Sequence, residues 1–100
     1  MSRVTETQVA TAVVRYLAGI NGHSATRYQI KKALPNYLQL STADRAQSET
    51  RPHEEMWEQQ VRNIVSHRRT VGNFIYEGRL EHSPRRLTLT AAGLVFAGTL

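Results

Sequence analysis

The sequence predicts an α+β fold, mainly helical, in which three helices precede a small β-hairpin and a short terminal helix. The main helical stretch has apolar side chains at i, i+4, i+7, i+8 and i+11, which share one face: Trp57, Val61, Ile64, Val65 and the stem of Arg68. Residues 80–82 then lead to a Ser83-Pro84-Arg85 turn, and residues 87–90 alternate apolar and polar with period two. A helix that leads into a small basic hairpin is typical of a winged helix-turn-helix domain.

Composition limits the chain to a single unit. One hundred residues with a 40% hydrophobic share support one core, so we expect one domain over residues 1–100. The net charge of +5 favours a polyanionic partner, although many modestly basic domains bind no nucleic acid. Cysteine is absent, which excludes disulfides and thiolate metal sites. No stretch approaches the roughly 18 apolar residues of a membrane span, and we expect a cytoplasmic protein without a membrane partner.

The first half of the chain predicts two helices and a strand. Thr5 and Gln8 form a capping-box pattern, and helical spacing continues from there to the Asn21-Gly22 stop, which predicts a helix over residues 6–20. Residues 23–26 predict a short strand. Residues 28–34 predict a second helix, ended by a proline, that is too short to stand alone and must pack on the first.

The second half begins with a polar segment. Residues 45–52 have little to bury, so we expect a mobile loop there. The main helix is predicted over residues 53–69, because Pro52 suits a first turn and the following glutamates complement the positive end of the helix dipole. We expect Gly72-Asn73 to mark its end. The apolar, glycine-spaced segment 91–100 predicts a short terminal helix that could offer a face for a homodimer.

The main helix and the hairpin carry the candidate binding residues. Asn and Gln pair bidentately with adenine and Arg with guanine, so a groove-facing helix needs such side chains. This set comprises His53, Met56, Gln59, Arg62, Asn63, Ser66 and Arg69. Arg85 and Arg86 at the hairpin turn could contact the DNA backbone or an adjacent minor groove. Trp57 belongs by phase to the buried face, but near the helix start it could also contact a base methyl group.

Catalysis and metal binding find little support in the sequence. The four histidines (His23, His53, His67 and His82) lack the pair spacing of a zinc site. The glutamates at 54, 55 and 58 cluster on one helix, whereas a metal-dependent nuclease needs acids that converge from several elements. We therefore expect no catalytic residue, no metal and no cofactor.

The motifs W-E-x-x-V-R, G-R-L-E and L-T-x-x-G resemble the winged-helix domains of prokaryotic restriction systems. They comprise Trp57, Glu58, Val61, Arg62, Gly78 to Glu81, Leu89, Thr90 and Gly93. Mrr-type proteins carry such a domain beside a nuclease, and modification-dependent restriction endonucleases use winged-helix domains to read methylated adenine in duplex DNA. The resemblance, which covers residues 52–93, implies a double-stranded DNA-recognition domain of such an endonuclease, with a fused or associated cleaving domain. It implies that helix 53–69 enters the major groove and that the wing 80–90 lies on the backbone.

Two other functions fit the same residues. One is a small winged-helix transcriptional regulator, which differs from a restriction-system recognition domain in its partner and its dimerisation rather than in its chemistry. A winged-helix domain can also be a protein-interaction module. Strong salt dependence of duplex binding would favour the DNA-binding functions, because neutralised phosphates release counterions.

Overall fold

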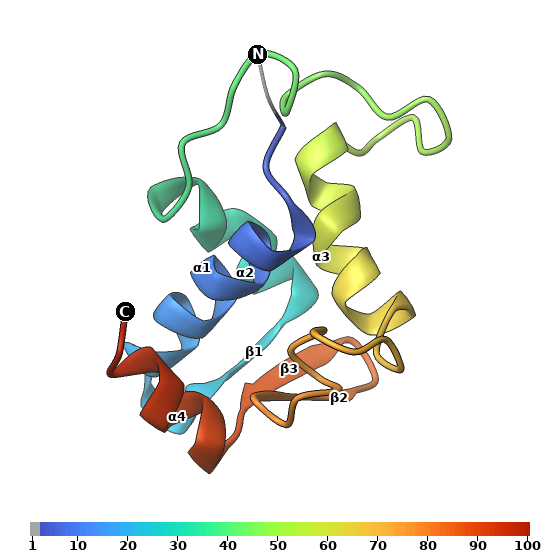
Figure 1. The fold of residues 1–100 in the computed structure, drawn as a ribbon. Coiled ribbons are helices and arrows are strands. Elements are labelled where there is room, and N and C mark those ends of the chain that lie inside the picture. The colour runs from blue at the N-terminus through green and yellow to red at the C-terminus, as the bar shows by residue number, and fades with distance from the viewer. Residues whose placement is uncertain (1–2) are drawn as a thin grey trace.

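The computed structural model describes residues 3–100, which form four α-helices and a three-stranded antiparallel sheet (Figure 1). The elements are α1 (Glu6–Ala18), β1 (Ser24–Thr26), α2 (Arg27–Ala33), α3 (Met56–Ser66), β2 (Leu80–Ser83), β3 (Arg86–Leu89) and α4 (Ala91–Ala97), with 3₁₀ turns at Asn21–His23 and Leu34–Asn36. The predicted α+β, mainly helical class is confirmed.

The sheet joins distant parts of the chain. Its strand order is β1-β3-β2, so the last strand in sequence lies in the centre and pairs with both others. Ala25 of β1 lies opposite Leu87, and Leu80 of β2 lies opposite Leu89. All four side chains are buried, so this register places one face of the sheet in the core. As a result the β2–β3 turn lies beside the start of α2.

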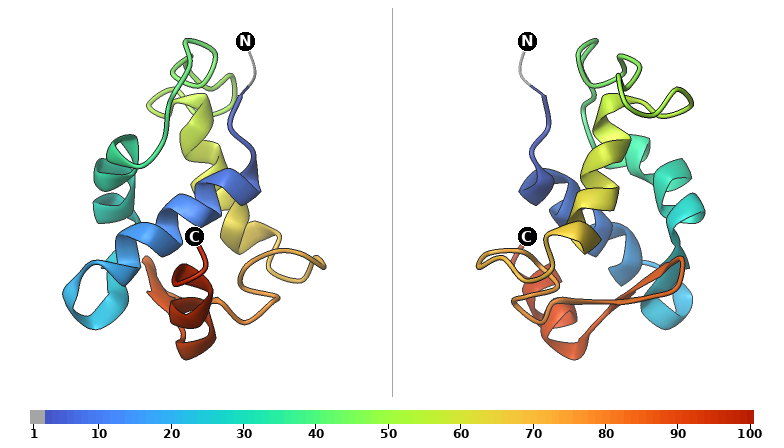
Figure 2. Two further views of the ribbon diagram at one scale, coloured as in Figure 1. Left: turned by 60° about the vertical axis from the view of Figure 1, so that its left-hand side comes forward. Right: turned by 90° about the vertical axis from the view of Figure 1, so that its right-hand side faces the viewer.

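Helix α1 runs through the middle of the fold and packs against α3, α4 and the sheet (Figure 2). Its buried residues are Val9, Ala10, Ala12, Val13, Val14 and Leu17. The predicted capping box is present, because the Gln8 backbone N–H donates to Thr5 Oγ1 at 3.1 Å and the Thr5 N–H donates to Gln8 Oε1 at 2.8 Å. On α3 the predicted apolar face is buried at Trp57, Val61 and Ile64, while Val65 and Arg68 are half-buried.

Two predicted helix ends near glycines were wrong by two or three residues. Helix α1 ends at Ala18 instead of residue 20, where the backbone N–H of Gly19 caps the last turn. Asn21-Gly22 lies in the following 3₁₀ turn, with Gly22 at a φ of 77°. Gly72 also has a positive φ of 92°, but α3 has ended by then at Ser66. At the hairpin, Ser83 belongs to β2, and Thr90 caps α4 instead of extending the strand.

The prediction of a main helix over 53–69 was wrong at both ends. A Glu55–Glu58 capping box starts α3, since the Glu55 N–H donates to Glu58 Oε1 at 3.2 Å, and groups from other segments cap its first and last turns. At its start, the N–H groups of Met56 and Trp57 donate to backbone carbonyls of residues 46 and 44, at 2.8 and 3.0 Å. At its end, Asn73 Nδ2 donates to the carbonyl of Ile64 at 2.9 Å. His53 therefore lies in the preceding loop and Arg69 in the turn that follows.

The connection between α2 and α3 is irregular but fastened to the body. Asp44 is 1% exposed, and its carboxylate accepts the N–H groups of Val4 at 2.8 Å and of Ser41 at 2.9 Å. Farther on, the buried Ser48 hydroxyl accepts the N–H of Arg51 at 3.2 Å, and residues 47 and 55 form a β-bridge. Of these anchors, only Ser48 and the bridge at residue 47 lie within residues 45–52, whose mobility stays a prediction.

Candidate nucleic-acid interface

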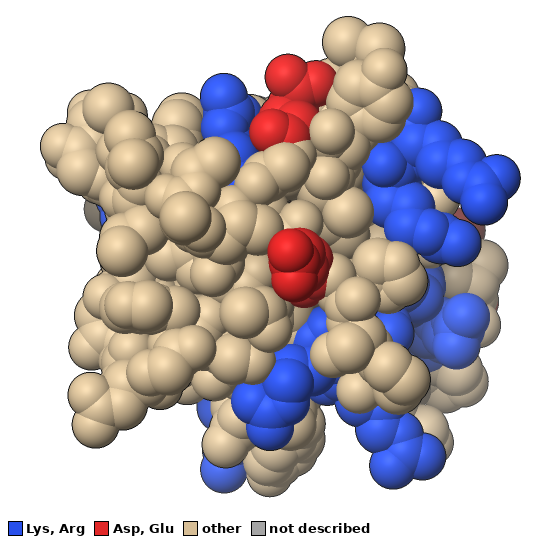
Figure 3. Space-filling view, turned by 90° about the horizontal axis from the view of Figure 1, so that it is seen from below, with Lys and Arg blue, Asp and Glu red and all other residues tan. Residues whose placement is uncertain are grey.

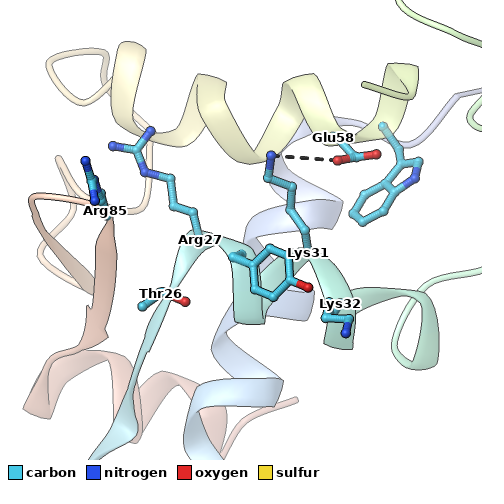
Figure 4. Close-up of a pocket in the computed structure, with 8 residues that line it drawn as sticks. Thr26, Arg27, Lys31, Lys32, Glu58 and Arg85 are labelled. Atoms are coloured by element: carbon cyan, nitrogen blue, oxygen red, sulfur yellow. Dashed lines mark ion pairs between the residues drawn. The ribbon is translucent and has the colours of Figure 1, made fainter. Parts of the chain in front are cut away.

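An open groove of about 750 Å³ lies between α2, α3 and the β2–β3 turn (Figure 4). Its lining residues are Thr26, Arg27, Tyr28, Lys31, Lys32, Trp57, Glu58 and Arg85. We call it the basic groove. The sheet order creates it, since the Arg27 backbone N–H donates to the carbonyl of Arg85 at 2.8 Å and ties α2 to the hairpin turn.

Helix α2 forms one wall of the basic groove. A second capping box fixes its start: the Gln29 N–H donates to Thr26 Oγ1 at 3.1 Å, and the Thr26 N–H donates to Gln29 Oε1 at 2.9 Å. Helical spacing then turns Ile30 into the core and leaves Tyr28 68% exposed. Lys32 Nζ lies 5.3 Å from the Tyr28 ring centroid, a cation–π distance. The wall thus offers an aromatic surface beside a cation.

Two carboxylates neutralise part of the cationic charge. Lys31 Nζ lies 3.7 Å from Glu58 and 3.8 Å from Glu54. The same Glu54 carboxylate accepts a hydrogen bond from Arg62 of α3. At the other end of the groove, Arg27 and Arg85 form no ion pair within residues 3–100. The positive charge of the basic groove is therefore partly neutralised at the end that holds Lys31, and it is not neutralised at the end that holds Arg27 and Arg85.

The hairpin turn presents Arg85 in an unusual backbone conformation. Pro84 and Arg85 form a two-residue connection between the paired residues Ser83 and Arg86. The φ of Arg85 is 63°, in the left-handed region that Gly and Asn adopt most readily. Arg86 turns away from the groove, because its Nη1 donates to the hydroxyl of Ser24 at 3.1 Å. The two predicted wing arginines thus occupy different environments.

The predicted reading residues of α3 are partly engaged within the protein. Gln59 Nε2 donates to the Ser48 hydroxyl of the preceding segment. Asn63 is half-buried, and its Nδ2 donates to the side-chain oxygen of Gln60 at 3.1 Å. Ser66 is exposed at the end of the helix. Gln59 and Asn63 would have to exchange these hydrogen bonds for bonds to a ligand.

The remaining predicted residues do not converge. His53 is exposed in the loop before α3, and Arg69 is exposed in the turn after it. Met56 is half-buried at the first position of α3. Trp57 lines the basic groove, but its indole is 4% exposed and its Nε1 donates to Glu55 at 2.8 Å. Contact of Trp57 with a methyl group would require the indole to be uncovered.

The cationic side chains gather on one side of the molecule. Seen from below, Lys and Arg crowd the side on which α3 and the hairpin lie in Figure 1, and the opposite side is largely uncharged (Figure 3). Such an asymmetric charge distribution attracts a polyanion toward one face.

Sequence reasoning missed Arg27, Tyr28 and Lys31 as site residues. The adjacent lysines at 31 and 32 were visible on the polar side of a predicted helix. Their meeting with the hairpin turn depends on β1–β3 pairing, which no local pattern encodes.

Comparisons of this chain with protein-family models, with curated proteins and with solved structures found no match. In residues 3–100 no three His, Asp or Glu side chains are grouped so that they could hold a metal ion. None of the helices in this part of the chain is long and apolar enough to cross a membrane.

Proposed function

We propose that this chain is a winged helix-turn-helix domain that binds double-stranded DNA. The observation that carries the proposal is the convergence of α2, α3 and the hairpin turn on one basic groove, through the strand order β1-β3-β2. A strand between the first two helices and a hairpin after the third fit a winged helix, with the β2–β3 hairpin as its wing. The long irregular connection between α2 and α3 is an addition to the tight turn of a simple helix-turn-helix unit.

The charge balance favours a phosphate backbone as ligand. Five cations lie in or beside the groove: Arg27, Lys31, Lys32, Arg62 and Arg85. Two carboxylates, Glu54 and Glu58, oppose them, so the local balance is 5 − 2 = +3, against +5 for the whole chain. Phosphate neutralisation by such cations supplies the sequence-independent part of DNA binding.

In this proposal the outer face of α3 enters the major groove and provides base contacts through Gln59, Asn63 and Ser66. The wing and α2 hold the backbone on either side. The resemblance of residues 52–93 to restriction-system domains favours a recognition module, and N6-methyladenine in duplex DNA is the ligand that it implies. A fused or associated nuclease would then supply cleavage.

A dimeric transcriptional regulator is the second candidate, favoured by the apolar surface of α4. Leu94 is 44% exposed and Val95 74% exposed, although both lie on a helix that also packs against α1. Neighbouring exposed apolar side chains can form part of a protein interface when they belong to a contiguous patch. Sedimentation analysis with and without a palindromic duplex would distinguish a dimer from a monomeric recognition module.

The experiment that tests the proposal is a binding titration on three matched duplexes: unmodified, adenine-methylated and cytosine-methylated, each at two salt concentrations. We expect salt-sensitive duplex binding that Arg27→Gln weakens. The matched control is Arg15→Gln, which removes an exposed cation of α1 outside the basic groove. A preference for methyladenine that survives higher salt supports the modification reader. Absence of binding to all three duplexes would overturn DNA binding and leave a protein-interaction module.

A further inference from the structure

We infer that Arg27 and Arg85 together form a binding site for one phosphate group of the DNA backbone. The inference rests on the proposed function and deepens it, because it assigns a single ligand group to two named side chains. Arg85 was predicted to contact the backbone, whereas Arg27 becomes a candidate only through the fold.

Arg27 and Arg85 are held next to each other by their backbones. The backbone hydrogen bond of 2.8 Å joins the residues themselves, and both side chains line the same groove. Figure 4 shows the Arg27 side chain extended toward α3, with its guanidinium on the side where Arg85 lies. Both guanidinium groups can therefore reach one anion in the open groove, and an anion bound between them would offset their mutual repulsion.

The guanidinium of Arg27 is not fully compensated within residues 3–100. Its side chain is half-buried, and its Nε is buried with no hydrogen-bond partner among the described residues. Withdrawing a charged donor from water without compensation is unfavourable. A phosphate oxygen would supply the missing hydrogen-bond acceptor, because guanidinium groups bind phosphate with paired, charge-assisted hydrogen bonds.

Arg85 is held in an unfavourable backbone conformation. A left-handed φ of 63° is unfavourable for a residue with a long side chain, and Gly or Asn would relieve it. Strained residues are concentrated at sites where the side chain must be presented in one direction. Here the direction is the end of the groove that holds Arg27.

The neighbouring charges limit the site to this end. Glu54 and Glu58 lie at the other end, paired with Lys31 and Arg62, and would repel a phosphate there. Arg86 is bonded to Ser24 and does not line the groove. One phosphate, held by Arg27 and Arg85, is therefore the stoichiometry that the structure favours.

The test is a scan of single neutral methylphosphonate linkages along a bound duplex, measured with the wild-type protein, Arg27→Gln and Arg85→Asn. One linkage should weaken wild-type binding by about eightfold at 0.1 M salt, because log K changes by about 0.9 per released counterion. The same linkage should have a smaller effect on each variant, since each variant has lost one of the two arginines that share the phosphate. Arg15→Gln should keep the wild-type pattern.

Several results would overturn the inference. If the two variants lose sensitivity at different linkages, the arginines bind separate phosphates. If both variants keep the full wild-type sensitivity at every linkage, neither arginine binds a backbone phosphate. Failure of the wild-type protein to bind any unmodified duplex instead refutes the proposed function itself. If Arg27→Gln does not fold, Arg27→Lys replaces it and should lose sensitivity only partly, because ammonium keeps the charge but not the paired hydrogen bonds.

Discussion

The Glu54 carboxylate sets how much cationic charge the proposed interface can offer to DNA. It is paired with both Arg62 and Lys31, and its side chain is 15% exposed. A phosphate that approaches either cation must compete with this carboxylate. The substitution Glu54→Gln keeps the size and an oxygen acceptor but removes the charge. We therefore expect it to strengthen duplex binding.

The magnitude follows from the local charge balance. Without the Glu54 charge, the balance at the groove rises from +3 to +4, which frees about one cation for a phosphate. One additional released counterion corresponds to about eightfold tighter binding at 0.1 M salt, so we expect a gain of about three- to eightfold. The slope of log K against log salt should steepen by up to about 0.9. The free energy of unfolding should fall by about 1–2 kcal/mol, since these ion pairs are partly buried.

Fluorescence anisotropy of a labelled duplex at several salt concentrations measures both the affinity and the slope. Glu49→Gln is the matched control, because Glu49 is exposed in the same segment and forms no ion pair among the described residues. It raises the net charge by the same amount. Equal gains for both variants would attribute the effect to net charge alone. An unchanged or weaker affinity of a folded Glu54→Gln protein would refute the reasoning.

Three further predictions concern stability and the wing. A Cβ at Gly93 would lie 2.1 Å from the Arg79 carbonyl oxygen, so Gly93→Ala should lower the free energy of unfolding by about 3 kcal/mol in urea titrations. The control Gly98→Ala should change the free energy of unfolding by less than about 1 kcal/mol. Equal changes for the two variants would contradict the close packing of α4. Asp44→Ala should lower the free energy of unfolding by about 3 kcal/mol, because the half-buried N–H groups of Val4 and Ser41 lose a charged acceptor. A decrease under about 1 kcal/mol in the same titration would show that this anchor is dispensable. Arg85→Asn should leave the melting temperature unchanged or raise it, because Asn tolerates the left-handed backbone conformation, and it should weaken duplex binding. A lowered melting temperature would argue against backbone strain at this residue.

Much of the fold follows from local sequence. The capping box of Thr5 and Gln8 starts α1 where predicted, since both hydrogen bonds join residues three positions apart. The apolar periodicity of α3 correctly identified its buried face, because helical spacing alone determines which side chains share a side. The hairpin also formed where its alternation and Pro84 predicted it. In each case the physical information lies within a few residues.

The tertiary structure decided the boundaries of α3. Its first N–H groups are capped by carbonyls of the preceding irregular segment, and its last turn is capped by the side chain of Asn73. The Glu55–Glu58 capping box at the start of α3 is local, but these other partners lie outside the helix, so the helical period could not reveal them. The same segment contributes Ser48 and Glu54, which occupy Gln59 and Arg62. The helical phase of α3 predicted that Gln59 and Arg62 face outward, but it could not predict that other side chains of the protein already bind them.

The candidate site also depends partly on local sequence and partly on tertiary structure. The sequence by itself singled out Arg85 and Arg86 as the basic turn of a hairpin. Only the strand order separated their roles, because β1 pairs with β3 and brings Ser24 to Arg86, 62 positions apart, and Arg27 to Arg85. Local patterns are set by hydrogen bonds and spacing between near neighbours, whereas a groove is set by which distant strands pair to bury a common core.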